Sequence, residues 1–136
     1  MIDTAHPLIE RATALAPTIA AQAKAHEAER RIARPLVDAF VEAGFYRMVV
    51  PRALGGEEVS PSVLVGVLER LAESDGSAAW CVMVGATTGL VAALLPEDDA
   101  RAVFHPRAVP SGVFAPIGVG VMEGDSLRVR GRWPFA

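Results

Sequence analysis

The sequence contains one cysteine, three histidines and slightly more acidic than basic residues. A single cysteine, Cys81, excludes an internal disulfide and a cysteine-based zinc site, and it suits a reducing, cytoplasmic environment. We expect its thiol to be buried inside a helix. The histidines, His6, His26 and His105, lack metal-ligand spacing, and we expect all three at the surface. The sequence therefore predicts no metal site.

Other absences exclude further classes of function. A net charge of -3 and a pI near 5.6 provide no basic surface for nucleic acid or an anionic membrane. The N-terminus has an early acid and no apolar run, so we expect no signal peptide. The sequence has no phosphate-binding glycine loop that opens a helix, and no G-x-S-x-G motif. These absences leave nucleophilic catalysis without a candidate residue.

A long uncharged stretch, Ser77 to Leu95, stands out in a chain that is 51% hydrophobic. Its apolar residues cover every face of a helix, which predicts a central helix buried on all sides. A membrane span is the alternative, but acidic residues flank the stretch and neither end has a basic cluster. Gly85 and Gly89 are spaced to let a neighbouring segment approach closely.

Helical periodicity predicts four further helices around this stretch. They are expected over residues 7–31, with a break or kink at Pro17, over 35–43, ending at Gly44, over 61–73, capped by Ser60, and over 96–104. We expect residues 45–50 to be extended. Gly55 and Gly56 then predict a turn.

The pattern changes after residue 106, where short β-prone runs alternate with glycine-rich turns. The runs are 109–116, 119–123 and 127–135, and strict alternation over 127–130 predicts a strand with one wet face. The predicted fold class is α+β: an all-α helical bundle over residues 1–106, followed by the first strands of a β-barrel domain over 107–136. Three strands cannot close a barrel, so we expect either a longer protein or completion by another chain.

Four segments in order resemble the acyl-CoA dehydrogenase superfamily of flavoproteins. Residues 51–56, PRALGG, are similar to the family's P-x-x-x-G-G loop, and SAAW at 77–80, FAPIG at 114–118 and GRWPFA at 131–136 add to the resemblance. Phe114-Ala115 departs from the Thr-Glu that is usual in the dehydrogenases. Together with the GRWPFA segment, this departure is more similar to the family's flavin-dependent monooxygenase branch.

The resemblance implies a flavin, FAD with FMN as the alternative, between the helical and β domains. Phe135 takes the place of the flavin-stacking Trp, and Trp133 that of a Lys. The implied cofactor-binding residues are Phe114, Ala115, Pro116, Gly118, Trp133 and Phe135, and ordinary β-domain core is the alternative for the two aromatic residues. The implied substrate-binding residues are Trp80, Val84 and Thr88, which also fit a plain packing stripe.

The resemblance also implies partners. The substrate would be an acyl-CoA or, in the monooxygenase branch, an aromatic compound hydroxylated with reduced flavin from a partner reductase. The family's catalytic base and most of its oligomer-forming helices lie in a C-terminal domain, so the resemblance implies no catalytic residue in this chain. The expected assembly is a homo-oligomer such as a homotetramer. No nucleic acid or membrane is expected as a partner. The competing hypothesis is a non-catalytic helical interaction module whose β tail is completed by a partner chain.

Overall fold

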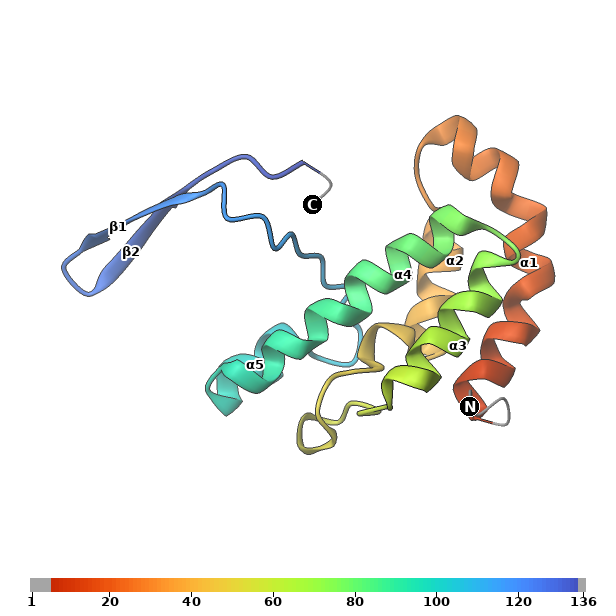
Figure 1. The fold of residues 1–136 in the computed structure, drawn as a ribbon, viewed down its shortest axis with the longest axis horizontal. Coiled ribbons are helices and arrows are strands. Elements are labelled where there is room, and N and C mark those ends of the chain that lie inside the picture. The colour runs from red at the N-terminus through yellow and green to blue at the C-terminus, as the bar shows by residue number, and fades with distance from the viewer. Residues whose placement is uncertain (1–5, 135–136) are drawn as a thin grey trace.

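The computed structural model describes residues 6–134 and shows a helical domain followed by a β-hairpin (Figure 1). The helices are α1 (Pro7–Glu29), α2 (Arg34–Glu42), α3 (Pro61–Ala72), α4 (Gly76–Thr88) and α5 (Glu97–Val103). Short 3-10 turns cover Phe45–Arg47, Arg52–Leu54 and Gly89–Leu94, and the strands are β1 (Val119–Glu123) and β2 (Ser126–Arg130). The predicted order of a helical domain and then strands is confirmed.

The core lies where α1, α2 and α4 meet α3 and the turn after α2. In Figure 1, α3 lies between α1 and α4, and these three helices make the main contacts of the bundle. Phe40 and Phe45 are fully buried, with ring centroids 5.9 Å apart in a tilted arrangement. Leu8, Ile19 and Leu71 fill the same cluster. Burial of these apolar side chains is the main stabilising term of the domain.

Most helix boundaries follow from the caps that the sequence predicts. The Ser60 side chain accepts a hydrogen bond from the Val63 amide, and Gly44 ends the α2 region with φ of 82°. Pro17 does not divide α1, which was expected to break or kink there. The proline removes only the amide that would bond the Thr13 carbonyl, and both residues are exposed, so water can satisfy that carbonyl.

Residues 45–50 are not the extended run that was predicted, and the segment folds back on itself as far as residue 59. It begins as a 3-10 turn and then folds back, so that the Glu57 amide bonds the Arg47 carbonyl at 3.0 Å and the Val59 amide bonds the Met48 carbonyl at 2.8 Å. Gly56 lies against this fold: a Cβ there would be 1.9 Å from the Val50 carbonyl oxygen. The chain therefore approaches itself too closely for any side chain at Gly56.

Arg47 fastens this folded-back segment to the end of α5. Its guanidinium donates to the carbonyls of Leu54 (2.7 Å), Gly55 (3.3 Å) and Phe104. One side chain thus satisfies carbonyls from two segments that lie far apart in sequence.

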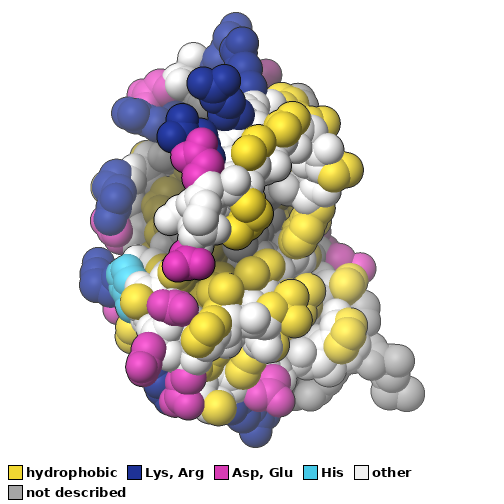
Figure 2. Space-filling view, turned by 90° about the vertical axis from the view of Figure 1, so that its left-hand side faces the viewer, with side chains coloured by type: hydrophobic (Ala, Val, Ile, Leu, Met, Phe, Trp, Pro, Cys, Tyr) yellow, Lys and Arg dark blue, Asp and Glu magenta, His cyan; other side chains and the backbone are white. Residues whose placement is uncertain are grey.

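The long uncharged stretch is buried on one face only, which corrects the expectation of burial on all sides. Ala78, Val82 and Ala86 are fully buried, whereas Trp80 is 60% and Leu94 82% exposed. The physical reason is that, within residues 6–134, α4 is packed mainly by α3 and the turn at 45–47. On the face drawn in Figure 2, hydrophobic side chains cover much of the surface, and charged ones gather towards its edges.

One helical run of the described chain, Gly76–Leu94, is long and apolar enough to cross a membrane, with a mean hydropathy of 1.6. This is weak evidence for a span, because core helices of soluble proteins pass the same test, and part of the run packs against the bundle.

The hairpin extends away from the helices (Figure 1). Its strands are antiparallel, with Val119 opposite Arg130 and Glu123 opposite Ser126, and Gly124 turns the chain with φ of 60°. Every residue of both strands is exposed. The prediction of one buried and one solvent-exposed face is therefore wrong for the described residues. The run 109–116, predicted as a strand, forms no strand, and its prolines at 110 and 116 cannot donate to a ladder.

Candidate substrate and cofactor sites

A buried polar pair fixes the start of α4, the helix that carries the predicted substrate residues. Asp75 accepts hydrogen bonds from the amides of Ser77 (2.8 Å) and Ala78 (3.4 Å) through one carboxylate oxygen. Its other oxygen lies 3.2 Å from Nδ1 of His26, in the last turn of α1. His26 was expected at the surface, but its side chain is 3% exposed. This burial could not be predicted from the sequence, because the pairing residue, Asp75, is 49 residues away.

Two of the three predicted substrate residues line one cavity. Trp80 and Val84 face a hollow of about 370 Å³ whose other walls include Val37, Tyr46 and Pro110. Such a volume is at the lower end of the range for small-molecule sites. Thr88 does not line it: its hydroxyl donates to the Val84 carbonyl at 2.8 Å, and its side chain packs over Gly112.

Tyr46 is a wall residue that the sequence analysis did not single out. Its ring lies where a side chain on α4 would otherwise be, because a Cβ on Gly85 would come within 2.5 Å of it. This is the close approach that the Gly85 and Gly89 spacing predicted. Burial, and to a lesser degree the nearby Cys81, raise the pKa of Tyr46 to about 12. The hydroxyl therefore keeps its proton, and can donate it in a hydrogen bond, at neutral pH.

Cys81 lies on the same side of α4 and is exposed, which corrects the prediction of a buried thiol. The side chain borders the open hollow beside Tyr46, so solvent reaches it. Partial burial and then the charge of Asp75 raise the pKa of the Cys81 thiol. A thiol with a raised pKa is a poor nucleophile at neutral pH.

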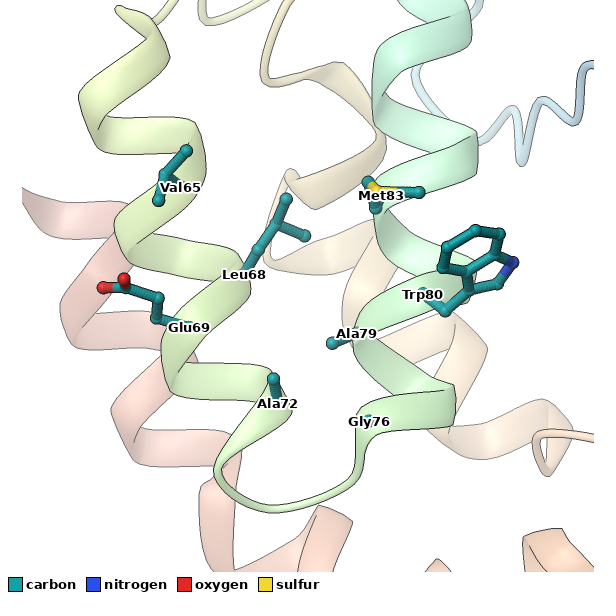
Figure 3. Close-up of a pocket in the computed structure, with 8 residues that line it drawn as sticks. All are labelled: Val65, Leu68, Glu69, Ala72, Gly76, Ala79, Trp80 and Met83. Atoms are coloured by element: carbon teal, nitrogen blue, oxygen red, sulfur yellow. The ribbon is translucent and has the colours of Figure 1, made fainter.

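A second, apolar groove of about 330 Å³ runs between α3 and α4 (Figure 3). Its lining residues are Val65, Leu68, Glu69, Ala72, Gly76, Ala79, Trp80 and Met83. In Figure 3, Leu68 points from α3 towards α4, whereas the indole of Trp80 projects from the side of α4 away from α3. Trp80 therefore separates the two hollows.

Three of the predicted cofactor residues, Ala115, Gly118 and Trp133, are in contact at the base of the hairpin. The indole nitrogen of Trp133 donates to the Ala115 carbonyl at 3.1 Å, and its ring covers Gly118 and Gly131, where a Cβ would come within 2.4 and 2.2 Å of it. Phe114 is 74% exposed, and Ala115, Pro116 and Gly118 are exposed as well. Phe135 lies outside the described residues. The structure thus joins 114–118 to Trp133, two segments separated by the whole hairpin.

The chemical character of these residues suits a flavin. Exposed backbone groups beside an indole, with no charged side chain between 113 and 118, match the hydrogen-bonding and stacking surface that a flat, uncharged ring system requires. Among residues 6–134, no group of three or more metal-ligating side chains is present.

Residues 8–99 match the family model described as acyl-CoA dehydrogenase, N-terminal domain. The chain is 34% identical over 110 residues to indole-3-acetate monooxygenase of Pseudomonas putida, an alignment that covers 79% of this chain and 28% of that protein. It is 26% identical to the flavin-dependent monooxygenase oxygenase subunit HsaA of Rhodococcus jostii, over 94% of this chain and 34% of the relative.

Solved structures agree with the sequence matches. The 3-HSA hydroxylase from Rhodococcus sp. RHA1 superposes with a TM-score of 0.87 at 26% identity, over 94% of this chain and 34% of that one. XiaF from Streptomyces sp., in complex with FADH2 and glycerol, superposes with a TM-score of 0.85 at 27% identity, over 93% and 33%. The chain spans about a third of the length of these relatives.

Proposed function

Because this chain belongs to the acyl-CoA dehydrogenase family through its N-terminal domain, we propose that it forms the N-terminal part of the oxygenase component of a flavin-dependent aromatic monooxygenase. One observation carries the proposal: its relatives in sequence and in structure include oxygenase components of such systems, matched from the first helix into the hairpin. The departure of Phe114-Ala115 from the dehydrogenase pattern supports the same branch.

We assign FAD as the cofactor, bound in its reduced form, with FMN as the alternative. Phe114, Ala115, Pro116 and Gly118 would offer backbone and apolar contacts, and Trp133 an aromatic surface, with Phe135 as the stacking residue. When bound, reduced flavin supplies the electrons with which molecular oxygen is activated for hydroxylation. Trp133 would also hold segment 114–118 in place through the hydrogen bond that its indole nitrogen donates to the Ala115 carbonyl.

The proposed substrate is a small aromatic compound in the hollow lined by Trp80 and Val84, with Thr88 packed on Gly112 next to the wall residue Ser111. Curated relatives are named for indole-3-acetate and for resorcinol, and both molecules are small enough for the 370 Å³ hollow. An acyl-CoA is the dehydrogenase alternative. No residue of this chain is assigned a proton-transfer step. The partners proposed are a flavin reductase and further copies of the same chain, in the cytoplasm.

The test is turnover of the protein with FAD, NADH, a flavin reductase and oxygen. Indole-3-acetate and resorcinol are supplied in turn, and the hydroxylated product, heavier by one oxygen atom, is detected by mass spectrometry. A folded protein that binds reduced FAD under anaerobic titration and hydroxylates either compound supports the proposal. A folded protein with no affinity for FAD or FMN in either redox state contradicts it and favours the interaction-module hypothesis.

The contribution of the hairpin base is tested by Trp133→Ala, with Trp80→Ala as the matched control. Loss of the Ala115 bond and of the indole surface is expected to weaken binding of reduced FAD about tenfold. Trp80→Ala removes an equally large side chain from the substrate hollow and is expected to leave flavin affinity within about twofold. Equal effects of the two substitutions on flavin affinity would overturn the assignment of the cofactor site.

A further inference from the structure

Two consecutive arginines lie where the substrate hollow meets a neighbouring one. Arg30 and Arg31 line both the 370 Å³ hollow and a second one of about 320 Å³, together with Ile32 and Cys81. Arg30 ends α1 in the left-handed conformation, with φ of 52° and ψ of 36°, so the chain turns sharply at this point. Within residues 6–134, neither guanidinium makes an ion pair or a side-chain hydrogen bond.

The larger of the two hollows, of about 370 Å³, is largely apolar and aromatic. Trp80 and Val84 form one wall, Pro110 lies on another, and Tyr46 supplies an aromatic ring with a protonated hydroxyl. An apolar pocket that has cationic donors at one end is complementary to a ligand with a flat hydrocarbon body and an anionic end.

His26 is part of the wall of the second hollow, but its Nε2 atom is buried. His26 lines this hollow, is 4% exposed, and has no hydrogen-bond partner for Nε2 among the described residues. The carboxylate of Asp75 already serves His26 Nδ1 and two amides, so its charge is balanced by donors. Because Nδ1 of His26 lies against the Asp75 carboxylate and Nε2 is buried, the two arginines, and not His26, are the donors open to a ligand here.

We propose that this arginine pair binds the anionic group of the substrate, which is therefore an aromatic acid rather than a neutral phenol. The carboxylate lies against Arg30 and Arg31 at the junction of the two hollows, and the ring lies between Trp80 and Tyr46. Glu27 lines the second hollow as well, and its negative charge opposes the arginines. The inference rests on the proposed function in taking the larger hollow as the substrate site.

The test compares two ligands that differ in charge and little else. Indole-3-acetate and its neutral amide, indole-3-acetamide, are titrated calorimetrically into the protein without flavin and again with oxidised FAD. We expect the acid to bind about tenfold more tightly than the amide, and the difference to shrink at high salt. Equal affinity for the two ligands, or absence of binding by either, overturns the inference.

The residues are tested with the double variant Arg30→Ala/Arg31→Ala. It is expected to abolish the preference for the acid and to leave the affinity for the amide unchanged. Arg70→Ala, which removes the same charge from the exposed face of α3, is the control and is expected to keep the preference. Glu27→Gln is expected to increase affinity for the acid about twofold. Should the double variant fail to fold, Arg31→Gln alone must reduce the preference at least threefold, or the assignment is wrong.

Failure of the proposed function gives a different result. A protein that binds the acid in preference to the amide, but does not consume reduced FAD to hydroxylate it, contradicts the monooxygenase proposal and supports the anion site. A protein that hydroxylates resorcinol and shows no preference for acids supports the monooxygenase proposal and contradicts the anion site.

Discussion

The helical domain and the hairpin that follows it are stabilised in different ways. The helical domain buries a continuous cluster of apolar side chains, whereas every residue of the hairpin strands is exposed. The hairpin is therefore held by its ladder and by Trp133, which packs on Gly118 and Gly131. Two-stranded ribbons without a covered face are marginal in water. We infer that the helical domain determines the measured free energy of unfolding. The hairpin needs contacts beyond its ladder to be stable.

The largest difference is expected between core and hairpin truncations. Phe40→Ala removes a fully buried ring that packs on Phe45, and should lower the free energy of unfolding by about 3–5 kcal/mol. Leu127→Ala removes a side chain that is 60% exposed in β2 and should cost less than about 1 kcal/mol. Urea denaturation measures both values, and similar losses would show that the two regions share one core.

Two glycines allow the same comparison with a smaller effect. Gly56→Ala places a methyl group 1.9 Å from the backbone oxygen of Val50, which cannot move without disrupting the folded-back segment, and should cost about 2–3 kcal/mol. Gly118→Ala meets the ring of Trp133 instead, a partly buried side chain that can rotate away, and should cost about 1 kcal/mol or less. Thermal unfolding distinguishes them, and a larger loss for Gly118→Ala would reverse the comparison.

The Asp75 pair tests how firmly α1 and α4 are joined inside the helical domain. Asp75→Ala removes a helix cap and leaves both nitrogens of His26 unpaired, with an expected loss of about 2 kcal/mol. Asp75→Ser retains a cap for α4 but loses the oxygen that pairs with His26, so about half of the loss should remain. If Asp75→Ser matched the wild type, the bond to His26 would contribute nothing measurable.

The pH dependence of stability provides a fourth test. The pKa of Tyr46 is raised from about 10 to about 12 in the folded protein, so its proton is retained when the unfolded chain has lost it. The contribution is fully present below pH 10 and is lost as the pH rises towards 12, at roughly 1 kcal/mol per pH unit. Comparison with Tyr46→Phe isolates this slope from other alkaline titrations. Identical slopes in the two proteins would contradict burial of the hydroxyl.

The smallest global effect is expected at the hairpin base. Trp133→Ala should change the free energy of unfolding of the helical domain by less than about 0.5 kcal/mol, since Trp133 contacts 115–118 and 131 rather than the core. Amide hydrogen exchange of residues 119–130 should nevertheless accelerate, because the hairpin loses its packing side chain. A large global loss would mean that the hairpin is integral to the domain.

Local signals made the helical domain predictable. Ser60, Pro61 and Gly44 act within a few residues of their own position, so the caps and stops of α2 and α3 could be identified from sequence. The errors arose at positions whose burial or conformation depends on contacts with residues distant in sequence. The partner of His26 is Asp75, and the carbonyls that hold Arg47 belong to residues as far away as Phe104. Neither pairing leaves a pattern in one sequence.

The candidate site shows the same division. Trp80 and Val84 could be placed on one face of a helix because they are four residues apart. Tyr46, Arg30 and Arg31 come from segments joined to that face only by tertiary packing, and the single signal for one of them was Gly85. The grouping of Trp133 with 114–118 came from resemblance to the family rather than from periodicity. The exposure of Trp80 and Cys81 depends on which neighbours surround α4.

The absence of a side chain at Gly85 has a consequence for ligand size. A Cβ at this position would lie 2.5 Å from the Tyr46 ring and 3.0 Å from the Pro110 carbonyl, so it sits between two walls of the hollow. A methyl group there would displace the ring or the loop and so change the shape of the hollow that both of them line. Conversely, trimming the phenol at 46 would widen that space without touching α4. The lack of a side chain at Gly85 therefore sets the separation between α4, the Tyr46 ring and the Pro110 loop, and with it the thickness of the ligand that the hollow can hold.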